Sequence, residues 1–144
     1  MRRKFLRAGR LTFREWGLFI HAWLLLLWVE LALRFFSYAR VSRWLSRIPN
    51  PTKKPQPPNP SANIQTTLQW VDTASRNHIL TITCLRRSLV AQNLLARQGI
   101  PVELRFGIKK DNDAFCAHAW LEYQGQAIGE AEQLTQAYQP LAKV

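Results

Sequence analysis

Two segments of the chain decide the predicted fold: TCLRRSLVAQNLLARQG at residues 83–99 and AFCAHAWLEYQGQAIGE at residues 114–130. The first segment spaces its apolar residues as a helix does and ends in Gly99, which is typical of a helix C-terminus. The second alternates apolar and polar residues, as antiparallel strands do. A thiol therefore begins a helix, and an imidazole and a carboxylate follow on strands further along the chain.

The elements around these segments complete an α+β pattern. A further amphipathic helix is predicted from Ser61, residues 102–108 alternate like a strand, and residues 109–113 are predicted to turn. Helices followed by strands favour an α+β fold in which the thiol-bearing helix packs on a small antiparallel sheet.

The positive charge is concentrated in the first part of the chain. Of 144 residues with a net charge of +11, residues 1–60 hold 12 Lys and Arg against two carboxylates, and residues 61–144 hold 8 against 7. No zinc-finger spacing or RNA-binding motif is present, so nucleic acid is not predicted as a partner. An anionic membrane surface or an acidic protein remains open.

The chain is predicted to divide into three parts within a length suited to one compact domain. Residues 1–48 form a basic, apolar helical region, residues 49–60 form a Pro-rich linker, and residues 61–144 form the core. Six prolines in residues 49–60 are incompatible with a helix or a sheet and predict an extended connection.

A long apolar helix is predicted near the N-terminus. Thr12 and Glu15 have the spacing of a capping box, and the uncharged stretch from Trp16 to Val29 is 14 residues long. A membrane span needs about 20 apolar residues, and extending the stretch would place Glu30 inside the bilayer. Three interpretations stay open: a helix that packs in the domain core or docks a partner, an interfacial membrane helix, and a span.

The two cysteines, Cys84 and Cys116, are predicted to be free thiols. No small-residue cleavage site follows the apolar stretch, so a secretory signal is not predicted, and a reducing cytoplasm is the expected location. Cys84 at a helix N-terminus meets unpaired backbone N–H groups and the positive end of the helix dipole, which favour the thiolate. Cys116 lies on a strand without that activation and is interpreted as structural.

His118 is the candidate base for Cys84, and a carboxylate is needed to orient it. If residues 123–125 form a three-residue loop, the predicted cross-strand pairs are Glu122 with Gln126, Trp120 with Ile128, and His118 with Glu130. Paired residues lie about 5 Å apart, which selects Glu130 as the orienting acid. Glu132 is the second choice, and Glu122 shares the face of His118.

The other two histidines are interpreted as non-catalytic. His21 has no second histidine or acid at helical spacing, and His78 falls in a predicted surface loop, although it precedes Cys84 closely enough to be an alternative base. No cofactor and no metal site are predicted.

Four sequence words resemble the B-type leader peptidases of lasso-peptide biosynthesis, a family of transglutaminase-like cysteine proteases. These words are CLRRSL at residues 84–89, LLARQGI at 94–100, FGI at 106–108 and HAWLE at 118–122. The resemblance implies a transglutaminase/papain-like fold, with Cys84 as the nucleophile, His118 as the general base and acid, and Glu130 as the orienting residue. Such proteins usually have Asp at the third position, so Glu130 departs from the family pattern.

The resemblance also implies a substrate and partners. The substrate would be the leader of a ribosomally made precursor peptide, and a lasso cyclase would act on the product. Residues 1–60 lack the strand pattern of the recognition domain that some members carry, so a separate small leader-recognition protein is expected, docking on the N-terminal helix. The expected location is the cytoplasm or the inner membrane face. Two alternatives remain: a transglutaminase-type acyltransferase with the same site, and a non-enzymatic membrane adaptor.

Overall fold

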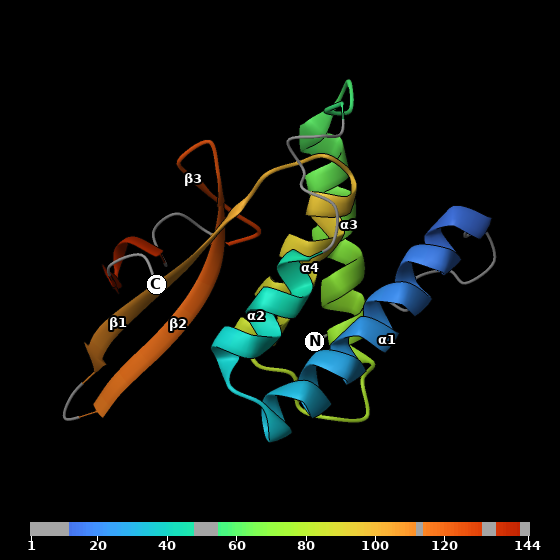
Figure 1. Ribbon diagram of the computed structural model, residues 1–144. Helices are drawn as coiled ribbons and strands as arrows, with labels where there is room; N and C mark the ends of the chain where they lie inside the picture. The colour runs from blue at the N-terminus through green and yellow to red at the C-terminus, as the bar shows by residue number, and fades with distance from the viewer. Residues whose placement is uncertain (1–11, 48–54, 112–113, 131–134, 142–144) are drawn as a thin grey trace, which may run out of the picture.

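The computed structural model describes residues 12–47, 55–111, 114–130 and 135–141. Within these residues, four helices stand beside a four-stranded antiparallel sheet of order β3-β2-β1-β4 (Figure 1). This arrangement confirms the predicted α+β class. The basic residues at positions 1–11 and most of the predicted Pro-rich linker lie outside the described residues.

The first two helices come from the N-terminal region. Helix α1 spans Phe13–Phe35, and the capping box predicted at its start is present, because the Thr12 N–H and hydroxyl both donate to the Glu15 carboxylate at 2.8 Å. Helix α2 spans Tyr38–Ser46.

The next two helices carry the thiol-bearing segment and the helix that precedes it, and α3 begins one residue before the predicted start at Ser61. Helix α3 spans Pro60–Arg76, and the Asn59 side chain accepts a hydrogen bond from the Ala62 N–H at 3.1 Å. Helix α4 spans Cys84–Arg97, and the chain leaves it at Gly99. Helix α4 is central, since it contacts the other three helices as well as β1 and β2.

One hydrophobic core joins the N-terminal helices to the rest. It contains Leu26 and Val29 from α1, Val41 from α2, Leu89 from α4 and Leu121 from the sheet. Helices α1 and α2 therefore share one hydrophobic core with the thiol-bearing helix α4. The predicted division of the chain at the Pro-rich segment stays a prediction.

The strands differ in detail from the prediction. Strand β1 spans Glu103–Asp111, β2 spans Ala114–Tyr123, β3 spans Gln126–Ile128 and β4 spans Gln139–Pro140. The predicted turn at residues 109–113 is shorter than expected because β1 continues to Asp111 in register with Ala114. Strand β4, which the sequence analysis did not predict, pairs with the middle of β1.

The predicted register between β2 and β3 is wrong. Tyr123 pairs with Gln126 and Leu121 with Ile128, so the loop has two residues instead of three. Gln124 and Gly125 both take positive φ angles, 52° and 80°, which is the geometry of a type I′ turn. Glu122 therefore pairs with Ala127 instead of Gln126, Ile128 pairs with Leu121 instead of Trp120, and β3 ends before it could pair with His118.

Candidate active site

Cys84 is the first residue of α4, as predicted, and Thr83 is its N-cap. The Cys84 side chain is half-buried, and the thiol is free. Arg86, two residues after Cys84, donates from Nη1 to the Thr83 hydroxyl at 3.1 Å and forms an ion pair with Glu30 of α1. The first turn of α4 is therefore fixed to α1 at the point where the thiol sits.

His118 of β2 and Glu130 are hydrogen-bonded, with Nε2 and Oε2 2.5 Å apart. Each side chain is 20% exposed, so the pair is accessible from one side only. An ionised carboxylate only accepts hydrogen bonds, so with Glu130 ionised the imidazole proton lies on Nε2. Nδ1 is then the ring nitrogen free to accept a proton.

Gly129 explains how Glu130 reaches His118 although the predicted register is wrong. In the observed register residue 130 lies beyond the end of β3, and strict alternation would place its side chain on the other face. Gly129 has φ of +78°, which turns the chain after Ile128 and brings Glu130 back to His118. A Cβ at position 129 would lie 3.0 Å from Leu68 Cδ1 of α3, so a residue with a side chain would also have to displace the end of Leu68.

Glu122 is engaged elsewhere. Its Oε2 accepts from Arg105 Nε at 2.9 Å and its Oε1 accepts from Trp120 Nε1 at 3.1 Å. The other alternative, Glu132, lies outside the described residues. Among the acids that the structure describes, Glu130 is the one hydrogen-bonded to His118.

Two aromatic rings flank His118. The Trp120 ring of β2 lies nearly parallel to the imidazole at a centroid distance of 6.2 Å. The Tyr138 ring, from the residue just before β4, lies with its centroid 5.2 Å from that of the imidazole. Both approach β1 at Gly107, where a Cβ would meet the Tyr138 Cβ at 2.7 Å and the Trp120 ring at 2.8 Å. Gly107 therefore makes room for the rings that restrict the imidazole.

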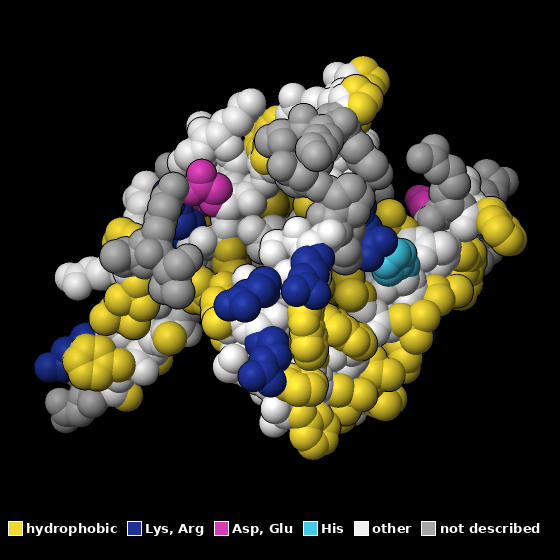
Figure 2. Space-filling view, in the orientation of Figure 1, with side chains coloured by type: hydrophobic (Ala, Val, Ile, Leu, Met, Phe, Trp, Pro, Cys, Tyr) yellow, Lys and Arg dark blue, Asp and Glu magenta, His cyan; other side chains and the backbone are white. Residues whose placement is uncertain are grey.

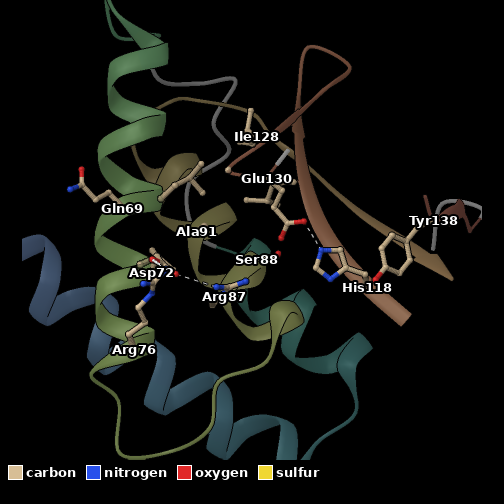
Figure 3. A pocket seen from close by; sticks show the side chains of 14 residues that line it. Gln69, Asp72, Arg76, Arg87, Ser88, Ala91, His118, Ile128, Glu130 and Tyr138 are labelled. Atoms are coloured by element: carbon tan, nitrogen blue, oxygen red, sulfur yellow. Dashed lines mark hydrogen bonds and ion pairs between the residues drawn. The ribbon is translucent and has the colours of Figure 1, made fainter. Parts of the chain in front are cut away.

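A groove with a cavity volume of about 640 Å³ opens beside this pair (Figure 3). His118, Glu130 and Tyr138 line one side, and α3 and α4 supply the other side with Asp72 and Arg87. Asp72 accepts from Arg87 at 3.2 Å and forms an ion pair with Arg76 at 2.9 Å. The His118–Glu130 pair and the Asp72–Arg87 pair thus both face the groove.

Cys84 lies one helical turn before the groove-lining part of α4 and makes no hydrogen bond to His118. Ser88, one helical turn after Cys84, lines the groove and donates to the backbone carbonyl of Ala119 at 3.3 Å, so α4 touches β2 beside His118. Within the described part of the chain the Cys84 thiol has no hydrogen-bond partner, and Cys84 is not among the groove-lining residues.

The remaining candidate residues lie apart from the groove. Cys116 is an exposed free thiol on β2. His78 accepts from the Leu80 N–H at 3.2 Å and packs against Trp23, with centroids 4.8 Å apart and the rings tilted by 37°, and His21 is exposed on α1. No group of three or more His, Cys, Asp or Glu residues in the described ranges is placed to hold a metal ion.

Sequence reasoning missed Tyr138 and Asp72. Asp72 lies on a helix predicted as merely amphipathic, and its partner Arg87 belongs to another helix. Tyr138 precedes a two-residue strand that is too short to have a periodicity. No local pattern identifies either residue.

A helix that begins with a cysteine, packed on an antiparallel sheet that carries a histidine paired with an acid, is the arrangement of papain-like and transglutaminase-like thiol enzymes. The family model of the transglutaminase-like superfamily matches residues 24–143, and the chain belongs to this superfamily. The superfamily includes cysteine proteases and acyltransferases. Comparison with curated proteins and with solved structures gave no match.

Proposed function

We propose that this chain is a cysteine peptidase that removes the leader from a ribosomally synthesised lasso-peptide precursor. Membership of the superfamily supports the thiol chemistry. The sequence words shared with B-type leader peptidases support the substrate class. The observation that carries the proposal is the His118–Glu130 hydrogen bond, which lies on the wall of a groove that also reaches α4.

The proposed reaction begins with proton transfer from the Cys84 thiol to Nδ1 of His118, while Glu130 holds Nε2. The thiolate attacks the carbonyl carbon of the last leader residue, and the carbonyl electron pair moves to oxygen. The backbone N–H of Cys84 is the proposed first donor to this oxyanion. Collapse breaks the peptide bond, His118 returns its proton to the departing amine of the core, and the leader remains as a thioester.

Water completes the reaction. It gives a proton to His118 as its oxygen attacks the thioester carbonyl, and the Cys84 thiolate leaves and is reprotonated. The products are a leader with a free carboxylic acid and a core peptide with a free amine. That amine is what a partner cyclase would join to an acidic side chain of the core.

The proposal requires Cys84 to approach His118 when a peptide occupies the groove. Catalytic hydrogen bonds are often absent without substrate and form in the complex. Ser88, one turn after Cys84, holds α4 against β2 beside His118, which keeps the elements that carry the two groups in contact.

Leader recognition and location belong to the same proposal. A separate small recognition protein would deliver the precursor, the cyclase would take the core, and the reactions would occur in the cytoplasm. A transglutaminase-type acyltransferase is the second candidate, because the superfamily includes acyltransferases. In that case an amine, not water, resolves the thioester.

Incubation of the full-length protein with its precursor and the recognition protein, followed by mass spectrometry, tests the proposal. We expect a leader ending in a free acid, and an amide-linked leader would instead establish the acyltransferase. Cys84→Ala and His118→Ala should reduce leader release by at least about 10³-fold, since triad members act as a unit.

Two matched controls give the test its specificity. Cys116→Ser should retain release, and Glu132→Gln should reduce it less than Glu130→Gln does. Release that survives Cys84→Ala but is lost in Cys116→Ser would contradict the assignment of the nucleophile. Equal losses at Glu130 and Glu132 would contradict the assignment of the orienting acid.

A further inference from the structure

The outward side of α1 carries a continuous row of exposed apolar side chains, which we call the outer stripe. Its members recur at spacings of three or four residues, so they share one side of the helix from end to end. The stripe consists of Phe13, Trp16, Ile20, Leu24, Trp28, Leu31 and Phe35, which are 41–97% exposed. Figure 2 shows hydrophobic side chains gathered along this part of the surface.

The opposite side of α1 is committed to the protein core. Ala22, Leu26 and Val29 are fully buried, and Glu30 pairs with Arg86 of α4. Residues 15–35 are long and apolar enough to cross a membrane by length and composition. A span would expose the core side of α1 to lipid and break the Glu30–Arg86 pair, so the folded protein can offer only the outer stripe to a bilayer.

Positive charge borders the outer stripe. Arg40, Arg43 and Arg47 of α2 are exposed, and Figure 2 shows Lys and Arg side chains beside the apolar surface. Helix α2 is attached to the stripe, because Trp44 packs against Trp28 with ring centroids 6.1 Å apart.

Charges of the opposite sign are scarce on this side. Residues 1–60 contain only two carboxylates, Glu15 and Glu30. Glu15 is bound to the N-cap of α1, and Glu30 is buried. The surface therefore combines an apolar row with a rim of one charge sign.

We propose that the outer stripe and the α2 arginines bind the surface of an anionic lipid bilayer, with α1 lying in the plane of the interface. Interfacial helices present Trp and Leu to the acyl region and Arg to the headgroups. At 1.5 Å per residue the 23-residue helix offers a straight contact about 34 Å long. The α2 arginines stand beside the part of this contact around Trp28, and their single charge sign suits an anionic surface.

Membrane binding leaves the candidate active site open. The groove is lined by residues of α3, α4 and the sheet region, with none from α1 or α2. A soluble peptide can therefore enter the groove while the outer stripe is covered.

Vesicle sedimentation of the full-length protein tests the proposal. The probes are phosphatidylcholine vesicles with and without 25% phosphatidylglycerol, at about 0.05 M and 0.5 M salt, which differ several-fold in Debye length. We expect at least tenfold tighter binding to the anionic vesicles and a large loss at high salt. Arg40→Glu with Arg43→Glu should weaken that binding at least about 20-fold, because each basic residue near the surface contributes about fivefold.

A matched pair of apolar substitutions localises the contact. Ile20→Ser with Leu24→Ser should weaken vesicle binding at least about tenfold, and Ile79→Ser with Phe115→Ser, which are more exposed and lie outside the stripe, should not. Circular dichroism of each variant checks that it folds, and leader release without vesicles should remain within twofold. Equal binding to neutral and anionic vesicles, or equal losses from the two apolar pairs, would overturn the proposal. Absence of vesicle binding, with recognition-protein binding lost in the stripe variants, would assign the stripe to that protein instead.

Discussion

Replacement of Glu30 by Gln tests how the N-terminal helix supports the thiol. The Glu30 side chain is 6% exposed and that of Arg86 22% exposed, and Arg86 also holds the Thr83 hydroxyl at 3.1 Å. Breaking a buried ion pair costs about 3–5 kcal/mol, because one charge is left without its partner. Partial exposure of Arg86 and its bond to Thr83 reduce the expected loss for Glu30→Gln to about 2–3 kcal/mol.

That free energy is large enough to measure by thermal unfolding. At this chain length 1 kcal/mol corresponds to about 3 °C, so Glu30→Gln should lower Tm by about 6–9 °C. The side chain of Arg34, which also reaches Glu30, is 62% exposed, so the control Arg34→Met should cost no more than about 1 kcal/mol.

A double-mutant cycle separates the ion pair from general damage to the core. Glu30→Gln combined with Arg86→Met should be less destabilising than the sum of the single changes, by about 1.5 kcal/mol or more. Hydrogen exchange at the amides of residues 84–88 should quicken about tenfold in Glu30→Gln, because the first turn of α4 opens more readily. Additivity of the two changes within about 0.5 kcal/mol, with unchanged exchange at these amides, would refute the view that α1 fixes the position of Cys84.

Two further predictions concern the site aromatics and the pH dependence of stability. Gly107→Ala should lower the free energy of unfolding by about 1–3 kcal/mol and reduce leader release, because the added Cβ displaces Tyr138 and Trp120 around His118. In the control Gly17→Ala the added Cβ would have nothing within 4 Å, so this change should be neutral or stabilising. Equal effects of the two changes would contradict this account. Partial desolvation against the protein surface and the charge of Arg97 lower the pKa of His21 below its usual 6.5, so the unfolded chain binds this proton more readily and stability falls as pH drops below 6.5. Tm of His21→Gln should therefore fall less than that of the unaltered protein between pH 7.5 and 5.5, and a larger fall would show that the pKa of His21 is raised.

The helix boundaries were predictable because they depend on neighbouring residues. Thr12 and Glu15 begin α1 and Gly99 follows α4, each through contacts within a few residues, whereas α3 begins at Pro60, one residue before the predicted start at Ser61. Such contacts form wherever the local sequence allows them, so a pattern is enough to locate them.

The hairpin shows where local reasoning fails. Both two-residue and three-residue loops suit Gly125, and the choice depends on the positive φ of Gln124, an uncommon conformation for a residue with a side chain. Glu130 was nevertheless predicted to lie beside His118, because the turn at Gly129 compensates for the one-residue shift. The predicted contact was right, and the predicted register that led to it was wrong.

The role of Glu30 was not predictable from its surroundings in the sequence. In a stretch of apolar residues it appeared as a charge that opposes membrane insertion, and its partner Arg86 is far away along the chain. Tyr138 beside His118 and Asp72 beside Arg87 are equally non-local. Such pairs are set by how the helices pack on each other and on the sheet, which no short window contains.

Helix α1 also explains why hydropathy alone left three interpretations open. A helix that packs one side into a core and offers the other side to an apolar environment is apolar all round, so it lacks the polar side that marks an ordinary surface helix. Glu30 separates the possibilities, because its buried pair with Arg86 commits that side of α1 to the protein. The same pair fixes the first turn of α4, so the side of α1 that cannot meet lipid is the side that supports Cys84. The outer stripe and the groove are therefore different surfaces, and only the shared core connects them.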